Sequence, residues 1–258
     1  MVNPETGKLE GFEFFAGRQG WSYGFRKRGH SVYSTDIEDF EGIDLVQDFL
    51  ETTPEDFLKV YDGRRPDFVC ASPPCEAFSI AGIWFHWRRE EVWTPGKSDP
   101  EIVWTPISET ADLGIKLIEH LLYIIEQLNP RFFWIENPRG GLRKMPQMQH
   151  LPRETVTYCS YGDHRMKPTD LWGRFPDSWQ PRPMARPGRG KKYVIEEDGH
   201  RWVLGMDGKP SHHYAPRGYK KGGTQGTKGY WNRSHIPEEL SDEVAESATN
   251  PEDHRSWL

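Results

Sequence analysis

The amino-acid sequence predicts an α/β domain with a doubly wound, mostly parallel sheet, followed by a small, irregular and basic appendage. Over the first 175 residues, strand-like segments alternate with helix-like segments, which is the pattern of such sheets. Clusters of polar residues follow the expected strands, and ligands of this fold class bind beyond the carboxyl ends of the strands. After residue 175 the sequence becomes rich in Pro, Gly, Arg, Lys and Trp and shows little periodicity.

The first expected elements form a strand–helix–strand unit. Residues 12–17 (FEFFAG) predict a strand that ends at a glycine turn, and residues 21–28 predict the helix after it. Residues 30–37 (HSVYSTDI) alternate, contain β-branched and aromatic residues, and end on an acid, as a second strand would. A short segment at 45–49 follows. The next helix is expected to begin near Pro54, because proline suits a first helical position.

Further elements complete the sheet. Residues 66–74 (PDFVCASPP) are a short apolar run closed by prolines, which is typical of a buried parallel strand. Residues 107–128 predict the clearest helix, because apolar residues recur there at spacings of three and four. Residues 131–138 (RFFWIENP) predict the next strand, and residues 155–162 and 170–175 predict a closing pair.

Charge is distributed unevenly along the chain. The formal net charge is −6, but residues 182–233 hold twelve lysines and arginines against four acids, a net charge of +8. Such a surface suits a phosphate backbone, although a solvated basic loop would have the same composition. A helix over 236–248 and an acidic tail are expected after this region.

Cysteine content and hydropathy exclude several classes of protein. The three cysteines, Cys70, Cys75 and Cys159, are too few for a disulfide framework and form no Cys-x-x-Cys pair, which argues against a zinc ribbon. The N-terminal residues lack the apolar run of a signal peptide, and no window reaches the length of a membrane span. We expect a cytoplasmic protein that uses neither a membrane nor a metal, and the sequence is compatible with a monomer.

Two features suit a nucleotide-like ligand. The glycine turn within residues 13–20 would let the backbone approach a ligand and direct helix N–H groups towards it. Asp36, at the end of the second strand, is placed to accept hydrogen bonds from ribose hydroxyls. Each feature alone is equally compatible with an ordinary turn or a solvated carboxylate.

Three more positions suit chemistry on a polar heterocycle. Cys75 follows two prolines just after a strand, so its thiol is presented, whereas Cys70 lies within the apolar run and is expected in the core. Glu136 ends the next strand, and residues 164–167 (HRMK) supply cations. A thiolate can add to C6 of cytosine, a carboxylic acid at N3 can take up the developing charge, and an arginine can hold O2. The activated C5 then needs an electrophile, such as a methyl sulfonium held at the glycine turn.

These residues resemble the motifs of the DNA cytosine-C5 methyltransferases. PPCEAFSIAG (73–82) is similar to the Pro-Cys signature of that family, and FFAGRQG (14–20) to its turn for S-adenosyl-L-methionine (SAM). ENP (136–138) resembles the Glu-Asn-Val motif, and HRMK the basic Gln-x-Arg-x-Arg motif. Their order and spacing match over residues 11–175. The chain is therefore identified as a short member, with a Rossmann-like SAM-dependent methyltransferase fold.

The resemblance implies a role for each matching residue. Cys75 would be the nucleophile that adds to C6 of a flipped-out cytosine in double-stranded DNA, Glu136 the acid at N3, and Arg165, with Lys167, the cation that orients the base. Phe15 would stack on the adenine of SAM, Asp36 would hold the ribose, and Asp48 would accept from the adenine amino group. The predicted cofactor-binding set is Phe15, Gly17, Gly20, Asp36, Ile37, Asp48 and Pro74.

The resemblance, together with the change of composition and charge after residue 175, predicts a division of the chain. Residues 1–175 would be the SAM-binding catalytic domain, 176–235 a small DNA-contacting region, and 236–258 a C-terminal helix with an acidic tail. The expected DNA contacts in the basic region are Lys191, Lys192, Lys220 and Lys221. Residues 83–106, which hold four tryptophans, look like the mobile loop that closes over DNA. A bacterial or phage context is expected.

The sequence also departs from the family pattern. Gln19 stands where a glycine is usual, Pro138 where a valine is usual, and Lys167 where a second arginine is expected. The final Gly-Asn-Ser motif, which normally completes the SAM pocket, has no clear counterpart, and Asn250 is a poor candidate for it. Two alternatives stay open at this stage. One is a related C5 transferase that acts on RNA or a nucleotide or uses a modified SAM, and the other is a catalytically inactive DNA-binding homologue.

Overall fold

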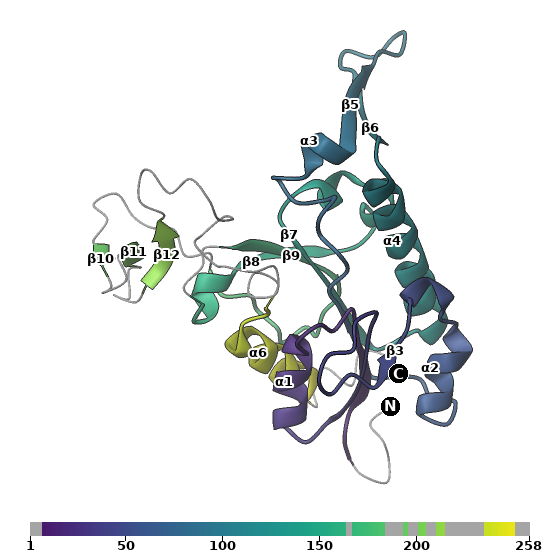
Figure 1. The fold of residues 1–258 in the computed structure, drawn as a ribbon, viewed down its shortest axis with the longest axis vertical. Coiled ribbons are helices and arrows are strands. Elements are labelled where there is room, and N and C mark those ends of the chain that lie inside the picture. Colours follow the sequence, from purple (N-terminus) through teal and green to yellow (C-terminus); the bar gives the residue numbers. More distant parts are fainter. Residues whose placement is uncertain are drawn as a thin grey trace.

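The protein is built on one large sheet with helices on both faces. The computed structural model describes residues 7–163, 167–183, 193–195, 201–204, 210–214 and 235–250. Within this part of the chain, seven strands form a sheet in the order β3-β2-β1-β4-β7-β9-β8 (Figure 1). Neighbouring strands from β3 to β7 are parallel, and β9 runs antiparallel to both β7 and β8. The predicted doubly wound, mostly parallel α/β class is confirmed.

The N-terminal elements follow the expected order, with ends that shift by one to three residues. They are β1 (Glu10–Phe14), α1 (Gly20–Lys27), β2 (Ser31–Asp36), β3 (Leu45–Val46), η1 (Phe49–Glu51) and α2 (Pro54–Val60). Helix α2 begins where Pro54 predicts. Thr53 and Asp56 form a capping box at this end, in which Asp56 Oδ2 accepts from the Thr53 backbone N–H at 3.0 Å.

The second half of the sheet also follows the prediction. Its elements are β4 (Phe68–Ala71), α4 (Glu109–Leu128), β7 (Phe132–Pro138), β8 (Arg153–Thr157) and β9 (Pro168–Arg174), with the short helices η2 (Gly141–Lys144), η3 (Pro146–Met148) and η4 (Tyr158–Tyr161). Strands β8 and β9 are the expected closing pair, and each begins two residues earlier than predicted. Strand β8 ends at Thr157, because Tyr158–Tyr161, predicted as its second half, form η4.

Alternation along the buried strands divides the core between the two faces of the sheet. Phe12 and Phe14 of β1 pack against α2 and α4, together with Val69 and Ile135 from the neighbouring strands. The residues between them, such as Phe68 and Trp134, face α1 and the C-terminal helix α6 (Glu238–Ala248). Figure 1 shows α1 with α6 on one side of the sheet and α2 with α4 on the other.

The predicted C-terminal helix is present, and it packs closely on α1. Gly24 of α1 donates its N–H to Ser241 Oγ of α6 at 2.9 Å, and Ser241 Oγ donates to the carbonyl of Trp21 at 2.7 Å. A Cβ added at Gly24 would lie 2.2 Å from the Ser241 carbonyl oxygen, so only glycine allows the two helices to approach this closely. Helix α6 thus fixes the short segment before it, residues 235–237, against the end of α1.

The segment expected as a loop over 83–106 contains regular structure. It forms α3 (Ile83–His86) and an antiparallel hairpin of β5 (Trp87–Val92) and β6 (Glu101–Pro106), which projects from the domain (Figure 1). The prediction of a loop was wrong because most side chains of the two strands are exposed, so no alternation between a buried and an exposed face marks them in the sequence.

The basic region contains a second small sheet. Strands β10 (Tyr193–Ile195), β11 (Arg201–Leu204) and β12 (Pro210–Tyr214) pair in antiparallel fashion, with a register shift between Val203 and Leu204. The sequence indicates few regular elements between residues 176 and 235, and the described residues of this region include these three strands. The four lysines predicted to contact DNA lie outside the described residues.

Candidate active site

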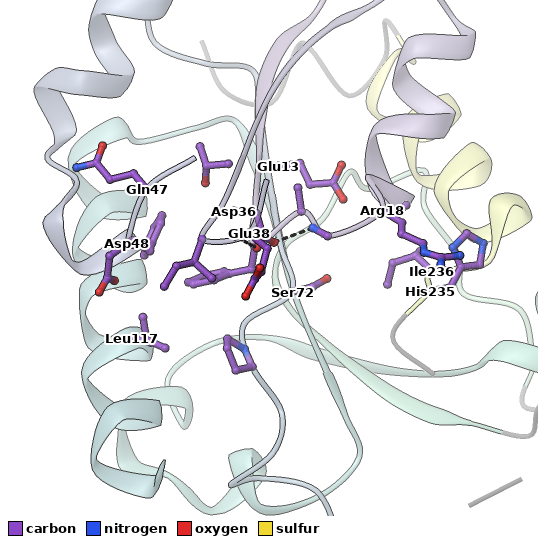
Figure 2. A pocket seen from close by; sticks show the side chains of 18 of the residues that line it. Glu13, Arg18, Asp36, Glu38, Gln47, Asp48, Ser72, Leu117, His235 and Ile236 are labelled. Atoms are coloured by element: carbon purple, nitrogen blue, oxygen red, sulfur yellow. Dashed lines mark hydrogen bonds between the residues drawn. The ribbon is translucent and has the colours of Figure 1, made fainter. Parts of the chain in front are cut away.

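A cavity of about 350 Å³ lies at the carboxyl ends of β1, β2 and β4. That volume is within the roughly 300–1,000 Å³ of small-molecule sites. All seven residues of the predicted cofactor-binding set line the cavity: Phe15, Gly17, Gly20, Asp36, Ile37, Asp48 and Pro74. Figure 2 shows labelled side chains on two sides of the cavity, Gln47 and Asp48 on one, and Arg18, His235 and Ile236 on the other.

The glycine turn between β1 and α1 is tightly wound. Phe15, Gly17 and Gln19 have φ values of 54°, 51° and 56°, in the left-handed region that favours glycine. Gln19 occupies a position where the family usually has glycine, and its side chain supports this conformation: Nε2 donates to the Glu41 carbonyl at 2.9 Å, and Oε1 accepts from Arg26. Gly20 is needed for another reason, since a Cβ there would lie 2.8 Å from Cβ of Ile236.

Asp36 connects the end of β2 to this turn. Its Oδ2 accepts from the backbone N–H of Gly17 at 2.8 Å (dashed line in Figure 2), and its Oδ1 accepts from the N–H of Glu38 at 3.0 Å. The carboxylate is therefore held at the cavity wall. Each oxygen can accept more than one hydrogen bond, so donors from a ligand such as ribose hydroxyls can still be bound.

The opposite wall of the cavity is aromatic and apolar. The rings of Phe15 and Phe49 lie 4.6 Å apart, and Leu117 of α4 lies beside them in the lining. Asp48 accepts from the N–H of Leu50 at 3.0 Å and so caps η1, which fixes its carboxylate at the cavity. An apolar wall with one acceptor at its edge suits a flat heterocycle that carries an amino group.

His235 and Ile236 also line the cavity, and neither was among the site residues predicted from the sequence. They precede α6 and are brought to the cavity by its packing on α1. A proline followed by an amphipathic helix was the available signal, but it indicates a helix and not the surface on which the helix packs.

Glu13 is a further lining residue that the sequence did not reveal. It is buried in the middle of β1, where its Oε1 and Oε2 accept from the backbone N–H groups of Trp21 and Ser22 at 3.1 and 2.7 Å, and from the Ser22 hydroxyl. Burial raises the pKa of Glu13 to about 7, because the loss of solvent outweighs these hydrogen bonds.

The raised pKa predicts a pH-dependent stability. The unfolded chain loses the Glu13 proton near pH 4.5, whereas the folded protein keeps it up to about pH 7. The folded state therefore loses stability relative to the unfolded state as pH rises through this window, by an amount on the order of 3 kcal/mol. Urea unfolding of wild type and Glu13→Gln between pH 4.5 and 8 should show a difference in unfolding free energy that changes with pH. The exposed control Glu41→Gln should follow wild type. A parallel dependence in wild type and Glu13→Gln would refute the assignment.

The loop after β4 presents Cys75. Cys75 is half-buried, and its carbonyl accepts from the N–H groups of Phe78 and Ser79 at 3.1 and 2.8 Å, so the loop turns directly after it. Pro74, the preceding residue, lines the cavity. Cys70 is fully buried as expected, and burial raises the pKa of its thiol well above the ordinary value.

Glu136 lies at the end of the adjacent strand β7. Parallel pairing of β4 with β7 places Ala71 beside Ile135, so the loop that carries Cys75 leaves the sheet at the edge where Glu136 lies in the last part of β7. The next residue, Asn137, donates from Nδ2 to the carbonyl of Pro73 at 3.1 Å. This buried hydrogen bond joins the strand of Glu136 to the loop of Cys75.

The Glu136 carboxyl group is buried and hydrogen-bonded on one oxygen. The side chain is 6% exposed, and Oε1 accepts from the hydroxyl of Tyr158 at 2.8 Å and from Nζ of Lys167 at 3.4 Å. Tyr158 is itself fully buried, and Lys167 Nζ lies 4.5 Å from the centre of its ring. Of the two predicted cations, Lys167 thus contacts Glu136, and Arg165 lies outside the described residues.

Two other expectations concern metals and membranes. Within the described ranges, no group of three or more His, Cys, Asp or Glu side chains is placed to hold a metal ion. None of the helices in that part of the chain is long and apolar enough to cross a membrane.

Comparison with known proteins connects these features to one family. A sequence model of the C-5 cytosine-specific DNA methylases matches residues 9–151. The chain is 30% identical over 148 residues to a "Probable DNA (cytosine-5)-methyltransferase" of Frog virus 3 (isolate Goorha), a match that covers 57% of this chain and 61% of the viral protein. The chain therefore spans less than two thirds of the length of that relative.

Two solved structures are also similar. A DNA modification methyltransferase encoded within an E. coli prophage is 15% identical, with 74% of this chain and 61% of that chain covered and a TM-score of 0.46. Spodoptera frugiperda DNMT2 is 15% identical, with coverages of 69% and 55% and a TM-score of 0.41. Both TM-scores are below 0.5, so the assignment to a family rests on the two sequence matches and not on these structures.

Proposed function

Because the chain belongs to the C-5 cytosine-specific DNA methylase family, we propose that it transfers a methyl group to C5 of cytosine in DNA. The methyl donor of this family is SAM, so the predicted cofactor is confirmed at the level of the family. The observation that carries the proposal is the position of the 73–75 loop. Pro74 lines the cavity, and Asn137, which follows Glu136, holds the carbonyl of Pro73.

The lining of the cavity fits SAM. Phe15 and Phe49 would contact the adenine, and Asp48 would accept from its amino group. Asp36, already held by the turn, would accept from the ribose hydroxyls. Gly17, Gly20, Ile37 and Pro74 would line the rest of the site. When bound, SAM supplies the methyl group that C5 takes up.

The residues at the rim account for the activation of cytosine. The Cys75 thiolate forms a bond to C6, while Glu136 stabilises or protonates N3, so that electron density builds up at C5. After C5 has been methylated, its proton passes to water, the Cys75 thiolate leaves C6, and Glu136 takes back the N3 proton, which restores the aromatic ring. Arg165 and Lys167 are proposed to hold the base and Glu136 in place. The base must leave the DNA stack to reach Cys75, which costs about a few kcal/mol.

Contacts with the DNA backbone are proposed to offset that cost, and the basic region is the first candidate for them. Replacing Lys191, Lys192, Lys220 and Lys221 together by glutamine should raise the dissociation constant for DNA. The slope of the logarithm of the binding constant against the logarithm of the salt concentration should become less steep, by up to about 0.9 for each lysine that contacts a phosphate. SAM affinity should not change, because the cavity is lined by other residues. Titrations of labelled duplex at several salt concentrations would test this, and an unaltered salt slope would place DNA binding elsewhere.

The experiment that tests the function is transfer of tritium from methyl-labelled SAM to DNA, RNA and dCMP, assayed side by side. The proposal predicts label in DNA at C5 of cytosine. Label in RNA or dCMP alone would support the related transferase, and no label together with DNA binding would support the inactive homologue. A cytoplasmic location in a bacterial or phage context, and a monomeric state, remain predictions.

A further inference from the structure

A second cavity lies at the root of the β5–β6 hairpin, away from the proposed SAM site. Its volume is about 370 Å³, and we call it the hairpin groove. The lining residues come from two segments, one that runs from after Cys75 through the β5–β6 hairpin, and one after β7 that includes η2. They are Ile80, Ile83, Trp84, Arg89, Trp104, Arg139, Gly140, Gly141, Arg143 and Lys144. Four of them are cationic and none is acidic.

The walls of the groove are fixed to the domain. Trp87, at the start of β5, is 2% exposed and donates from Nε1 to the carbonyl of Ala77 at 2.9 Å. On the other wall, the N–H of Gly141 donates to the carbonyl of Phe78 at 2.5 Å, and a Cβ at Gly140 would lie 2.3 Å from the same oxygen. The two segments that follow Cys75 and Glu136 therefore pack directly on each other.

Two of the four cations are available to an anion. Arg143 is paired with the buried carboxylate of Asp170, and Arg89 is paired with Glu91 at 2.8 Å. Arg139 and Lys144 are exposed, and neither forms an ion pair with a carboxylate of the described residues. Lys144 Nζ lies 4.8 Å from the centre of the Trp104 ring, so its charge is held over the groove wall.

The groove also offers an aromatic surface. Trp84 is 66% exposed, and its ring centre lies 5.9 Å from that of Trp104. A large exposed ring beside unpaired cations is the combination that binds a nucleic-acid strand, because bases stack on the ring and phosphates pair with the cations. A purely anionic ligand would not need the ring, and a purely apolar one would leave the cations without partners.

We propose that the hairpin groove binds the nucleotide next to the target cytosine on the same strand, with its base on Trp84 and its phosphate at Arg139 and Lys144. The proposal rests on the proposed function, because it takes Cys75 and Glu136 to mark the target base. DNA and RNA both supply a base and a phosphate of this kind, so the test uses a DNA strand and an RNA strand.

The test measures binding of fluorescent single-stranded DNA and RNA, each a run of thymine or uracil with one central cytosine. Trp84→Ala should bind the strand about tenfold more weakly than wild type does. Removing the bases on both sides of the cytosine should lower the affinity of wild type for the strand, but should not lower the affinity of Trp84→Ala further. The pair Arg139→Gln with Lys144→Gln should weaken binding and flatten its salt dependence.

Matched controls come from the same hairpin. Trp93 is 65% exposed but does not line the groove, and Arg88 and Lys97 are hairpin cations outside it. Trp93→Ala, and the pair Arg88→Gln with Lys97→Gln, should bind like wild type. Wild-type affinity in Trp84→Ala, or equal losses in the controls, would overturn the proposal. The binding assay needs no turnover, so the two failures can be told apart. If the groove variants bind like wild type while tritium transfer to DNA succeeds, the proposed function stands and the groove proposal falls. If the groove variants lose binding while no substrate is methylated, the groove still binds a nucleic-acid strand, but its place beside a target cytosine falls with the proposed function.

Discussion

Cys75→Ser is expected to lower methyl transfer by on the order of 10³-fold or more while SAM affinity stays nearly unchanged. The substitution replaces the thiolate that forms the bond to C6 by a hydroxyl, which is a far weaker nucleophile at neutral pH. Cys75 itself is not among the residues that line the cavity, so the SAM site should remain intact. Single-turnover transfer to DNA, with calorimetric SAM binding in parallel, measures both quantities.

The two other cysteines serve as controls. Cys159→Ala should keep activity. Cys70→Ala should keep activity but lose some stability, because Cys70 is fully buried in the core between the sheet and α1. Wild-type turnover by Cys75→Ser would show that Cys75 is not the nucleophile. Loss of activity in Cys159→Ala would show that the thiol of Cys159 is needed, which this assignment does not predict.

Glu136→Gln is expected to lower the rate of the chemical step by about 10²–10⁴-fold. Glutamine has nearly the same shape and can still accept from Tyr158, but it cannot supply a proton or a full negative charge at N3. DNA and SAM affinities should change much less than the rate. Transfer within twofold of wild type would show that N3 is not assisted by Glu136.

Tyr158→Phe is the companion variant. It removes one hydroxyl from a buried ring and leaves Lys167 as the remaining described donor to Glu136 Oε1. A hydrogen bond of this kind contributes about 0.5–1.5 kcal/mol, so a rate loss of up to about tenfold is expected if the hydroxyl orients the carboxyl group. No loss in Tyr158→Phe, with a large loss in Glu136→Gln, would limit Tyr158 to packing.

Parallel strand ends explain why much of the site could be predicted from the sequence. Asp36 ends an alternating segment, and Cys75 and Glu136 follow short apolar runs. Segments of this kind become strands of one sheet whose carboxyl ends share one edge. The local sequence therefore indicates both the strand and the side chain presented at its end. The structure places Asp36 at the cavity and joins the loop of Cys75 to the strand of Glu136 through Asn137.

The features that the sequence did not predict depend on contacts between distant segments. Ile236 reaches the cavity only because Gly24 and Ser241, far apart in the chain, allow α6 to pack on α1. Glu13 lies in an apolar strand, and its partners on α1 become neighbours only after the turn has formed. The β5–β6 hairpin carries exposed side chains on both strands, so its sequence lacks the alternation by which half-buried strands are identified.

Covalent trapping tests the central claim most directly. DNA copied with 5-fluorodeoxycytidine in place of deoxycytidine presents a fluorinated base at every candidate site, so the target sequence need not be known. After methyl transfer, the fluorine at C5 cannot leave as a proton does, and the bond between Cys75 and C6 should persist. We predict a denaturant-stable protein–DNA adduct that requires SAM, maps to Cys75 by mass spectrometry, and is absent in Cys75→Ser. Steady methylation of ordinary DNA without any adduct on the fluorinated copy would contradict the account.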